Sequence, residues 1–101
     1  MATTSKTLFR GAATTDTTTV LYTVPSATTS VITNIVVTNT DGASGDFTLA
    51  FAGTNFATTV TVGAYDSTVI DIKQPLATTE TITGGASAIT INFHISGVEI
   101  A

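Results

Sequence analysis

Short runs of β-branched residues, separated by turn-forming residues, limit the folds open to this chain. The densest run is residues 30–39 (SVITNIVVTN), in which half of the residues are Val or Ile and the others are Ser, Thr and Asn. Branching at Cβ restricts χ1 and favours a strand over a helix. Because apolar residues occur on both faces of this run, we expect a central strand with a neighbour on each edge.

Alternating apolar residues predict further strands along the chain. Residues 46–52 and 88–96 carry large apolar side chains at every second position, which is the period of a half-buried strand. Gly, Pro, Asn and Asp interrupt such runs about every 8–12 residues, and no window has helical periodicity. The sequence therefore predicts an all-β fold, an antiparallel β-sandwich of jelly-roll type with about eight short strands.

The same alternation predicts which side chains face inward. Pro75 should end the strand before it, since proline cannot donate to a ladder. Gly84 and Gly85 should break a short strand, and the last alternating run should end at Ser96. The expected core consists of Tyr22, Val31, Ile35, Val37, Phe47, Leu49, Phe51, Ile70, Ile72, Ile89, Ile91, Phe93 and Ile95.

The first nineteen residues lack this regular turn spacing. We therefore divide the chain into residues 1–19, an N-terminal arm and edge segment, and residues 20–101, the sandwich domain. Two of the three cations lie here and flank two large apolar residues that have no hairpin partner nearby. In one interpretation residues 1–10 dock on a partner, and in the other they form an ordinary edge strand. The interface residues of the first interpretation are Lys6, Leu8, Phe9 and Arg10.

Composition excludes several classes of function. Only 10% of the residues are charged, against about 25% in soluble domains, and Thr supplies about a quarter of the chain. A net charge of −4 with three cations excludes the basic patch that nucleic-acid binding needs. No apolar run approaches the roughly 18 residues of a membrane span, and the N-terminus lacks the apolar core of a signal peptide. We therefore expect neither nucleic acid nor membrane as a partner.

Side chains for catalysis or metal binding are scarce. His94 is the single histidine, cysteine is absent, and no spacing of His94 with Asp or Glu suggests a metal site or a hydrolytic triad. Glu80 and Glu99 are too far apart in sequence to argue for an acid–base pair. We expect no enzymatic activity, no catalytic residue, no cofactor and no metal site.

Sparse charge has a further consequence for association. Small β proteins block edge-to-edge pairing with charges, prolines or bulges, and this chain has few charges and two prolines. Either its own loops or partners must then cover its edges; we favour partners and expect a homo-oligomer.

Several segments resemble small virion structural proteins of tailed bacteriophages. Residues 21–25 (LYTVP) followed by residues 30–39 resemble the opening of these proteins, and residues 91–100 (INFHISGVEI) are similar to their close. Residues 67–76 followed by 79–82 fit the middle of the pattern. The resemblance implies a β-sandwich capsid decoration, or cement, protein. Because the functional surface of this group is an interface, the resemblance implies no catalytic residue.

Such a protein would bind the head surface as an oligomer, often a trimer, and stabilise it. Its partner would be the major capsid protein or another virion protein, and its location the capsid surface after synthesis in the host cytoplasm. The alternative is a tail, baseplate or fibre module that acts in assembly or in receptor or carbohydrate binding.

Overall fold

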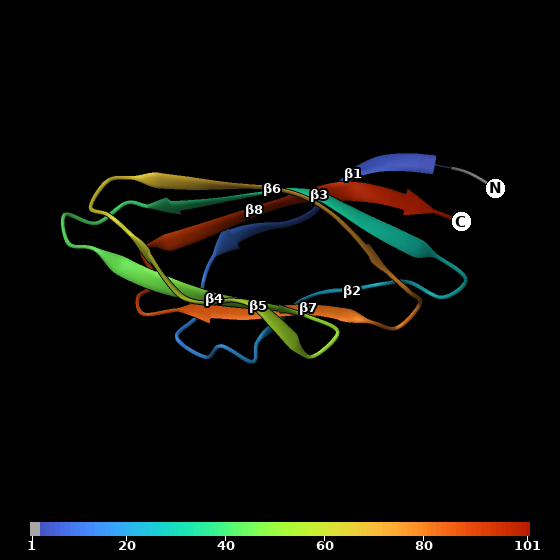
Figure 1. Ribbon diagram of the computed structural model, residues 1–101, viewed down its shortest axis with the longest axis horizontal. Helices are drawn as coiled ribbons and strands as arrows, with labels where there is room; N and C mark the ends of the chain where they lie inside the picture. Colours follow the sequence, from blue (N-terminus) through green and yellow to red (C-terminus); the bar gives the residue numbers. More distant parts are fainter. Residues whose placement is uncertain (1–2) are drawn as a thin grey trace.

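Eight strands form two four-stranded antiparallel sheets that pack face to face (Figure 1). The computed structural model describes residues 3–101, which contain no helix long and apolar enough to cross a membrane. The strands are β1 (Thr3–Ala12), β2 (Val20–Thr23), β3 (Thr29–Asn39), β4 (Gly45–Phe51), β5 (Thr54–Val62), β6 (Ser67–Leu76), β7 (Thr81–Ala86) and β8 (Ile91–Ile100).

Strand order identifies the sandwich as a jelly roll. The first sheet has the order β1-β8-β3-β6 and the second sheet the order β2-β7-β4-β5. Consecutive strands therefore alternate between the sheets, except for the β4–β5 hairpin, which is the double Greek-key path of a jelly roll. The predicted all-β sandwich is confirmed, and so is the central position of residues 30–39, because β3 pairs with β8 on one side and β6 on the other.

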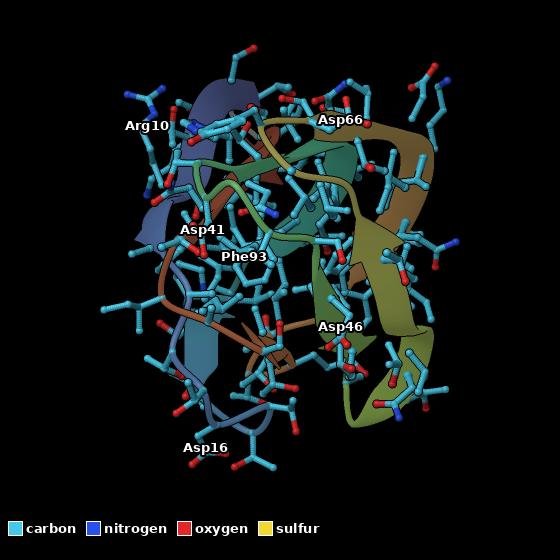
Figure 2. The ribbon with its side chains drawn as sticks, turned by 90° about the vertical axis from the view of Figure 1, so that its left-hand side faces the viewer. Arg10, Asp16, Asp41, Asp46, Asp66 and Phe93 are labelled. Atoms are coloured by element: carbon cyan, nitrogen blue, oxygen red, sulfur yellow. The ribbon has the colours of Figure 1, made fainter. Side chains whose placement is uncertain are left out.

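The core lies between the two sheets and follows most of the predicted pattern. Phe93 lies inside the sandwich (Figure 2), and its ring meets that of Phe47 edge to face, with 6.0 Å between the centroids. Tyr22, Ile70 and Ile72 are partly buried and pack against this core. The predicted residues that are buried are Ile35, Val37, Phe47, Leu49, Phe51, Ile91, Phe93 and Ile95.

Two predicted core residues, Val31 and Ile89, lie elsewhere. In β3 a register shift between Ile32 and Asn34 adds one residue, so Ile32 and Ile35 face the core together and Val31 turns outward. Ile32 is fully buried as a result. Ile89 is 69% exposed because β8 begins only at Ile91, and residues 88–90 lie in the turn before it.

Three predicted strand ends were wrong for identifiable reasons. β6 continues through Pro75 to Leu76, which is tolerated because β6 is an edge strand. β7 continues through Gly84 and Gly85. A Cβ on Gly85 would lie 2.4 Å from the carbonyl oxygen of Asp16, so this glycine permits close packing instead of breaking the strand. β8 likewise passes Ser96 and ends at Ile100.

The N-terminal segment belongs to the sandwich. Residues 3–12 form β1, which pairs antiparallel with β8 from Thr3 opposite Ile100 to Ala12 opposite Asn92. They are thus an edge strand and not a free arm, because their backbone completes the first sheet. Met1, at the start of the proposed arm, lies outside the described residues. The segment after β1 runs along β7, where the amide of Ala86 donates to the carbonyl oxygen of Thr14 at 2.9 Å.

Candidate assembly surface

Register shifts lie side by side across the first sheet. Relative to β8, β1 has one extra residue between the pairs Thr7–Ser96 and Phe9–Ile95. At the same level, β3 has one extra residue, Thr33, opposite the step from Ser96 to Gly97. β6 shifts again relative to this part of β3. Bulges bend strands and redirect side chains. These aligned register shifts therefore determine how the outer face of the first sheet curves and which side chains it exposes.

Gly97 lies at the centre of these register shifts. A Cβ atom at Gly97 would lie 2.4 Å from the carbonyl oxygen of Val31 and 2.8 Å from Cδ1 of Leu8. No larger residue fits between the two bulged neighbours without movement. An isolated glycine inside an alternating strand is the sequence signal for such a close approach.

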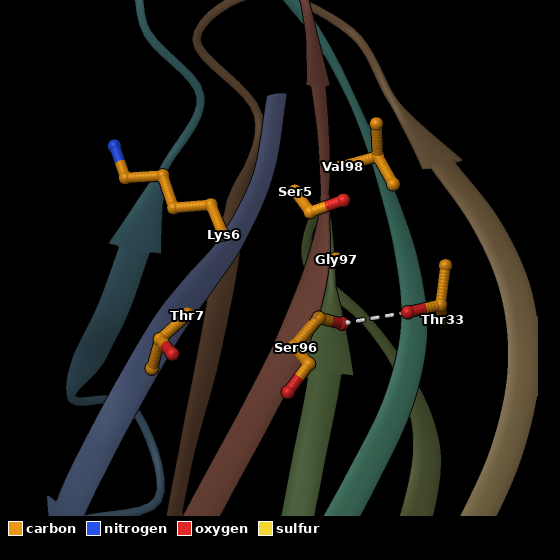
Figure 3. A pocket seen from close by; sticks show the side chains of 7 residues that line it. All are labelled: Ser5, Lys6, Thr7, Thr33, Ser96, Gly97 and Val98. Carbon is orange, nitrogen blue, oxygen red and sulfur yellow. Dashed lines mark hydrogen bonds between the residues drawn. The ribbon is translucent and has the colours of Figure 1, made fainter. Parts of the chain in front are cut away.

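An open hollow lies on the outer face at this level (Figure 3). The hydroxyl of Thr33 donates to the carbonyl oxygen of Ser96 at 3.3 Å, across the boundary between β3 and β8. Hydroxyl groups both donate and accept hydrogen bonds, so the hollow offers neutral polar contacts to a partner. It is lined by Ser5, Lys6, Thr7, Thr33, Ser96, Gly97 and Val98.

One cross-strand row beside the hollow spans all four strands. Arg10 of β1 lies opposite His94 of β8, His94 opposite Val36 of β3, and Val36 opposite Val69 of β6. Val69 is 62% exposed. In this row Arg10 lies at the β1 edge and the two valines lie towards the β6 edge, and the rows on either side of it on this face consist mainly of Ser, Thr and Asn. Low charge of this kind is typical of the central part of protein interfaces.

The four interface residues predicted from sequence do not form one patch. Leu8 is 8% exposed and belongs to the core, and Phe9 packs against it, because the bulge in β1 turns both side chains inward. Arg10 is exposed (Figure 2) and lies 3.4 Å from the Thr7 hydroxyl. Lys6 lines the hollow. Arg10 therefore remains as a candidate contact on the outer face, whereas the Lys6 side chain is directed away from the hollow (Figure 3) towards Glu99.

Lys6 also takes part in a polar network that joins the two sheets. Its Nζ atom lies 3.2 Å from Oε1 of Glu99, whose side chain is 15% exposed. The hydroxyl of Tyr22, in the second sheet, donates to Oε2 of Glu99 and lies 2.7 Å from Oγ of Ser30. The Tyr22 hydrogen bond, followed by Lys6, lowers the pKa of Glu99. Burial and then the Glu99 hydrogen bond raise the pKa of Tyr22.

Titratable side chains are otherwise dispersed. Asp16, Asp41, Asp46 and Asp66 are spread over separate segments at one end of the sandwich (Figure 2). Two hydrogen bonds from Thr18, its hydroxyl and its amide, lower the pKa of Asp16. Within residues 3–101, no group of three or more His, Cys, Asp and Glu side chains is placed to hold a metal ion.

Comparison with known proteins supports the fold. The chain matches no protein family and no curated protein sequence. Its fold is similar to that of a chain in the cryo-EM structure of the virus-like particle of the extra small virus of the giant freshwater prawn Macrobrachium rosenbergii. The likeness covers 100% of this chain and 81% of that chain, with a TM-score of 0.52 and 13% identity. It lends no support to the narrower resemblance to tailed bacteriophages.

Proposed function

We propose that this chain is a non-enzymatic structural protein of a virion that acts through its surfaces. The observation that carries the proposal is the jelly-roll strand order, whose fold likeness to a chain of a virus-like particle extends over the whole chain. Jelly rolls also serve other functions. The proposal therefore also rests on the chemistry of the outer face of the first sheet.

The outer face of the first sheet has the chemistry of a contact surface. Its hydroxyls are neutral, so the free-energy cost of removing water from them when a partner binds is lower than for charged groups. Exposed aliphatic side chains such as Val69 would add apolar burial. The cross-strand neighbours of His94 are Arg10 and Val36, which gives this histidine no carboxylate partner for acid–base chemistry.

Within the virion, the role we propose is capsid decoration. Copies of the chain would bind the head surface as an oligomer and stabilise it by bridging neighbouring coat subunits. The resemblance of residues 21–25, 30–39 and 91–100 to small virion proteins of tailed bacteriophages, which implies a decoration protein, favours this role. The major capsid protein would then be the partner that meets the outer face and its hollow.

Locating and counting the chain in purified particles tests the proposal. Decoration predicts an ordered arrangement on the head in cryo-EM maps, with a copy number comparable to that of the coat protein. A few copies at the tail or fibre would contradict decoration, and particles without the chain would contradict a virion role.

A matched pair of variants tests the surface. Ser96→Arg fills the hollow with a charged side chain, and we expect it to abolish particle binding at an unchanged melting temperature. Thr58→Arg, at an exposed position in β5, should bind normally. Equal binding by both variants would exclude the hollow from the interface.

A further inference from the structure

One edge strand of the sandwich has a regular half that lacks the features that prevent edge-to-edge pairing. Edge strands present unpaired N–H and C=O groups, and charges, bulges and short length protect them. β1 carries Lys6 and Arg10 and a bulge, and β2 has four residues and a register shift. β5 has two register shifts against β4, and Thr59 lies in the left-handed region with φ 51°. The fourth edge is β6, whose two charges, proline and register shift against β3 all lie at or beyond Asp71.

The first half of β6, residues 67–71, pairs regularly and has no charged side chain before Asp71. Residues 67–71 pair without a shift with β3, from Ser67 opposite Thr38 to Asp71 opposite Asn34. Among the strands of residues 3–101, β3 is the single pairing partner of β6. Val69, at the middle of this segment, is 62% exposed. The segment is therefore a regular template for another strand, with the Ser67 amide at its start already donating to Oδ1 of Asp66 at 2.8 Å.

We propose that the β6 edges of two copies of this chain pair antiparallel about a twofold axis at Val69. The pairing would join the two four-stranded first sheets into one continuous sheet of eight strands. This inference goes beyond the proposed function, since the edges would pair in the free protein whether or not a virion is its destination.

The two ends of the regular segment, Ser67 and Asp71, determine the register of the proposed β6–β6 pair. The register shifts beyond Asp71, and Pro75 lacks the N–H that a ladder uses. All five residues of the segment pair only when Val69 lies on the axis. Asp71 then lies opposite Ser67 of the second copy, whereas a register with the twofold axis at Asp71 would place the two Asp71 carboxylates opposite each other and destabilise the pair.

The same register extends the row of Arg10, His94, Val36 and Val69 at its valine end. Val36 lies directly opposite Val69 within one copy, and Val69 would lie directly opposite Val69 of the second copy. Four valines would then form a continuous stripe across the junction on the outer face. Cross-strand pairs of β-branched residues stabilise sheets, so the exposed valine gains a packing partner.

Disulfide crosslinking tests the register, because the chain contains no cysteine. In Val69→Cys the two cysteines would face each other at about 4.5–5.5 Å between Cα atoms, within disulfide range. In Ser67→Cys they would be offset by four residues, about 13 Å along the strands. We expect mild oxidation to give a disulfide dimer with Val69→Cys and with mixed Ser67→Cys and Asp71→Cys, but not with Ser67→Cys alone.

Charge variants provide a second, independent measurement by sedimentation velocity. Val69→Lys and Val69→Glu should each weaken dimerisation, and their equimolar mixture should restore it, while Thr58→Lys on β5 should dimerise like the unaltered protein. A protein that is monomeric at every concentration would overturn the proposal. So would equal crosslinking of Val69→Cys and Ser67→Cys, or a dimer indifferent to the charge at position 69. None of these results bears on particle content, which tests the virion role separately.

Discussion

Gly97 lies so close to Val31 that a Cβ atom on the glycine would come within 2.4 Å of the Val31 carbonyl oxygen. The contact joins β8 to β3 where β3 gains its extra residue. Side-chain size at position 97 therefore controls whether the two strands can keep their register.

Gly97→Ala should destabilise the domain. The added methyl group would collide with backbone, which cannot move as a flexible side chain does, and we expect a loss of about 1–3 kcal/mol in the free energy of unfolding. Urea denaturation measures this loss. Gly11→Ala is the matched control in the same sheet, because its nearest neighbour would be a Phe9 ring atom at 3.5 Å; its effect should stay within about 0.5 kcal/mol. Equal effects of the two substitutions would contradict the close approach at Gly97.

Phe93→Ala should be among the most damaging core substitutions. Phe93 is fully buried against the ring of Phe47, and truncating a buried phenylalanine costs about 3–5 kcal/mol. Thermal unfolding followed by circular dichroism measures the change. Ile89→Ala is the control, because Ile89 is 69% exposed in the turn before β8, and it should leave the melting temperature nearly unchanged. A large loss with Ile89→Ala would place that residue in the core after all.

Stability should decrease in acid through Glu99. The hydrogen bond from Tyr22, followed by Lys6, holds the pKa of Glu99 below its usual value in the folded protein. The carboxylate therefore stabilises the fold above the unfolded pKa of about 4.3, and this contribution is lost as the pH falls through the lower folded pKa. Urea denaturation between about pH 3 and pH 7 measures it.

Two variants separate Glu99 from the other acids. Asp16, whose pKa is also lowered, acts in the same direction, so the unaltered protein alone is not sufficient. Glu99→Gln and Tyr22→Phe should each flatten the dependence, and Tyr22→Phe should also cost about 1 kcal/mol at neutral pH. Acid profiles identical to that of the unaltered protein would rule out the network as their source.

Removing residues 1–10 should destabilise the domain and not merely detach a docking segment. The deletion takes Leu8 from the core and leaves one edge of β8 unpaired. A strongly lowered melting temperature is the expected result. Arg10→Ala, which removes an exposed side chain, serves as the control and should melt normally. If the truncated protein melted like the complete chain, the edge strand would contribute little to folding.

Alternation predicted the sandwich because period-two patterning is local information. It placed Phe47, Leu49 and Phe93 in the core correctly. It failed at Val31 and Ile32, since a bulge depends on the neighbouring strands and not on the residues of the strand itself. The partner of β1 was also beyond prediction: Leu8 has no nearby hairpin partner because its strand pairs with β8, at the opposite end of the chain.

The hollow was less predictable than the fold. Its lining comes from β1, β3 and β8, and its position depends on shifts in three strand pairings. The one local signal was Gly97, which interrupts an otherwise regular alternation. Lys6 and Arg10 were recognised as unusual because cations are rare in this chain, but which way their apolar neighbours point followed only from the bulge in β1.

The aligned register shifts also act as a crease. Strands bend at bulges, so the first sheet is bent along the register shifts that pass through Gly97. A rigid partner that contacts the outer face on both sides of this bend must have a matching shape. A flatter or more sharply curved partner would touch the face on one side of the bend only.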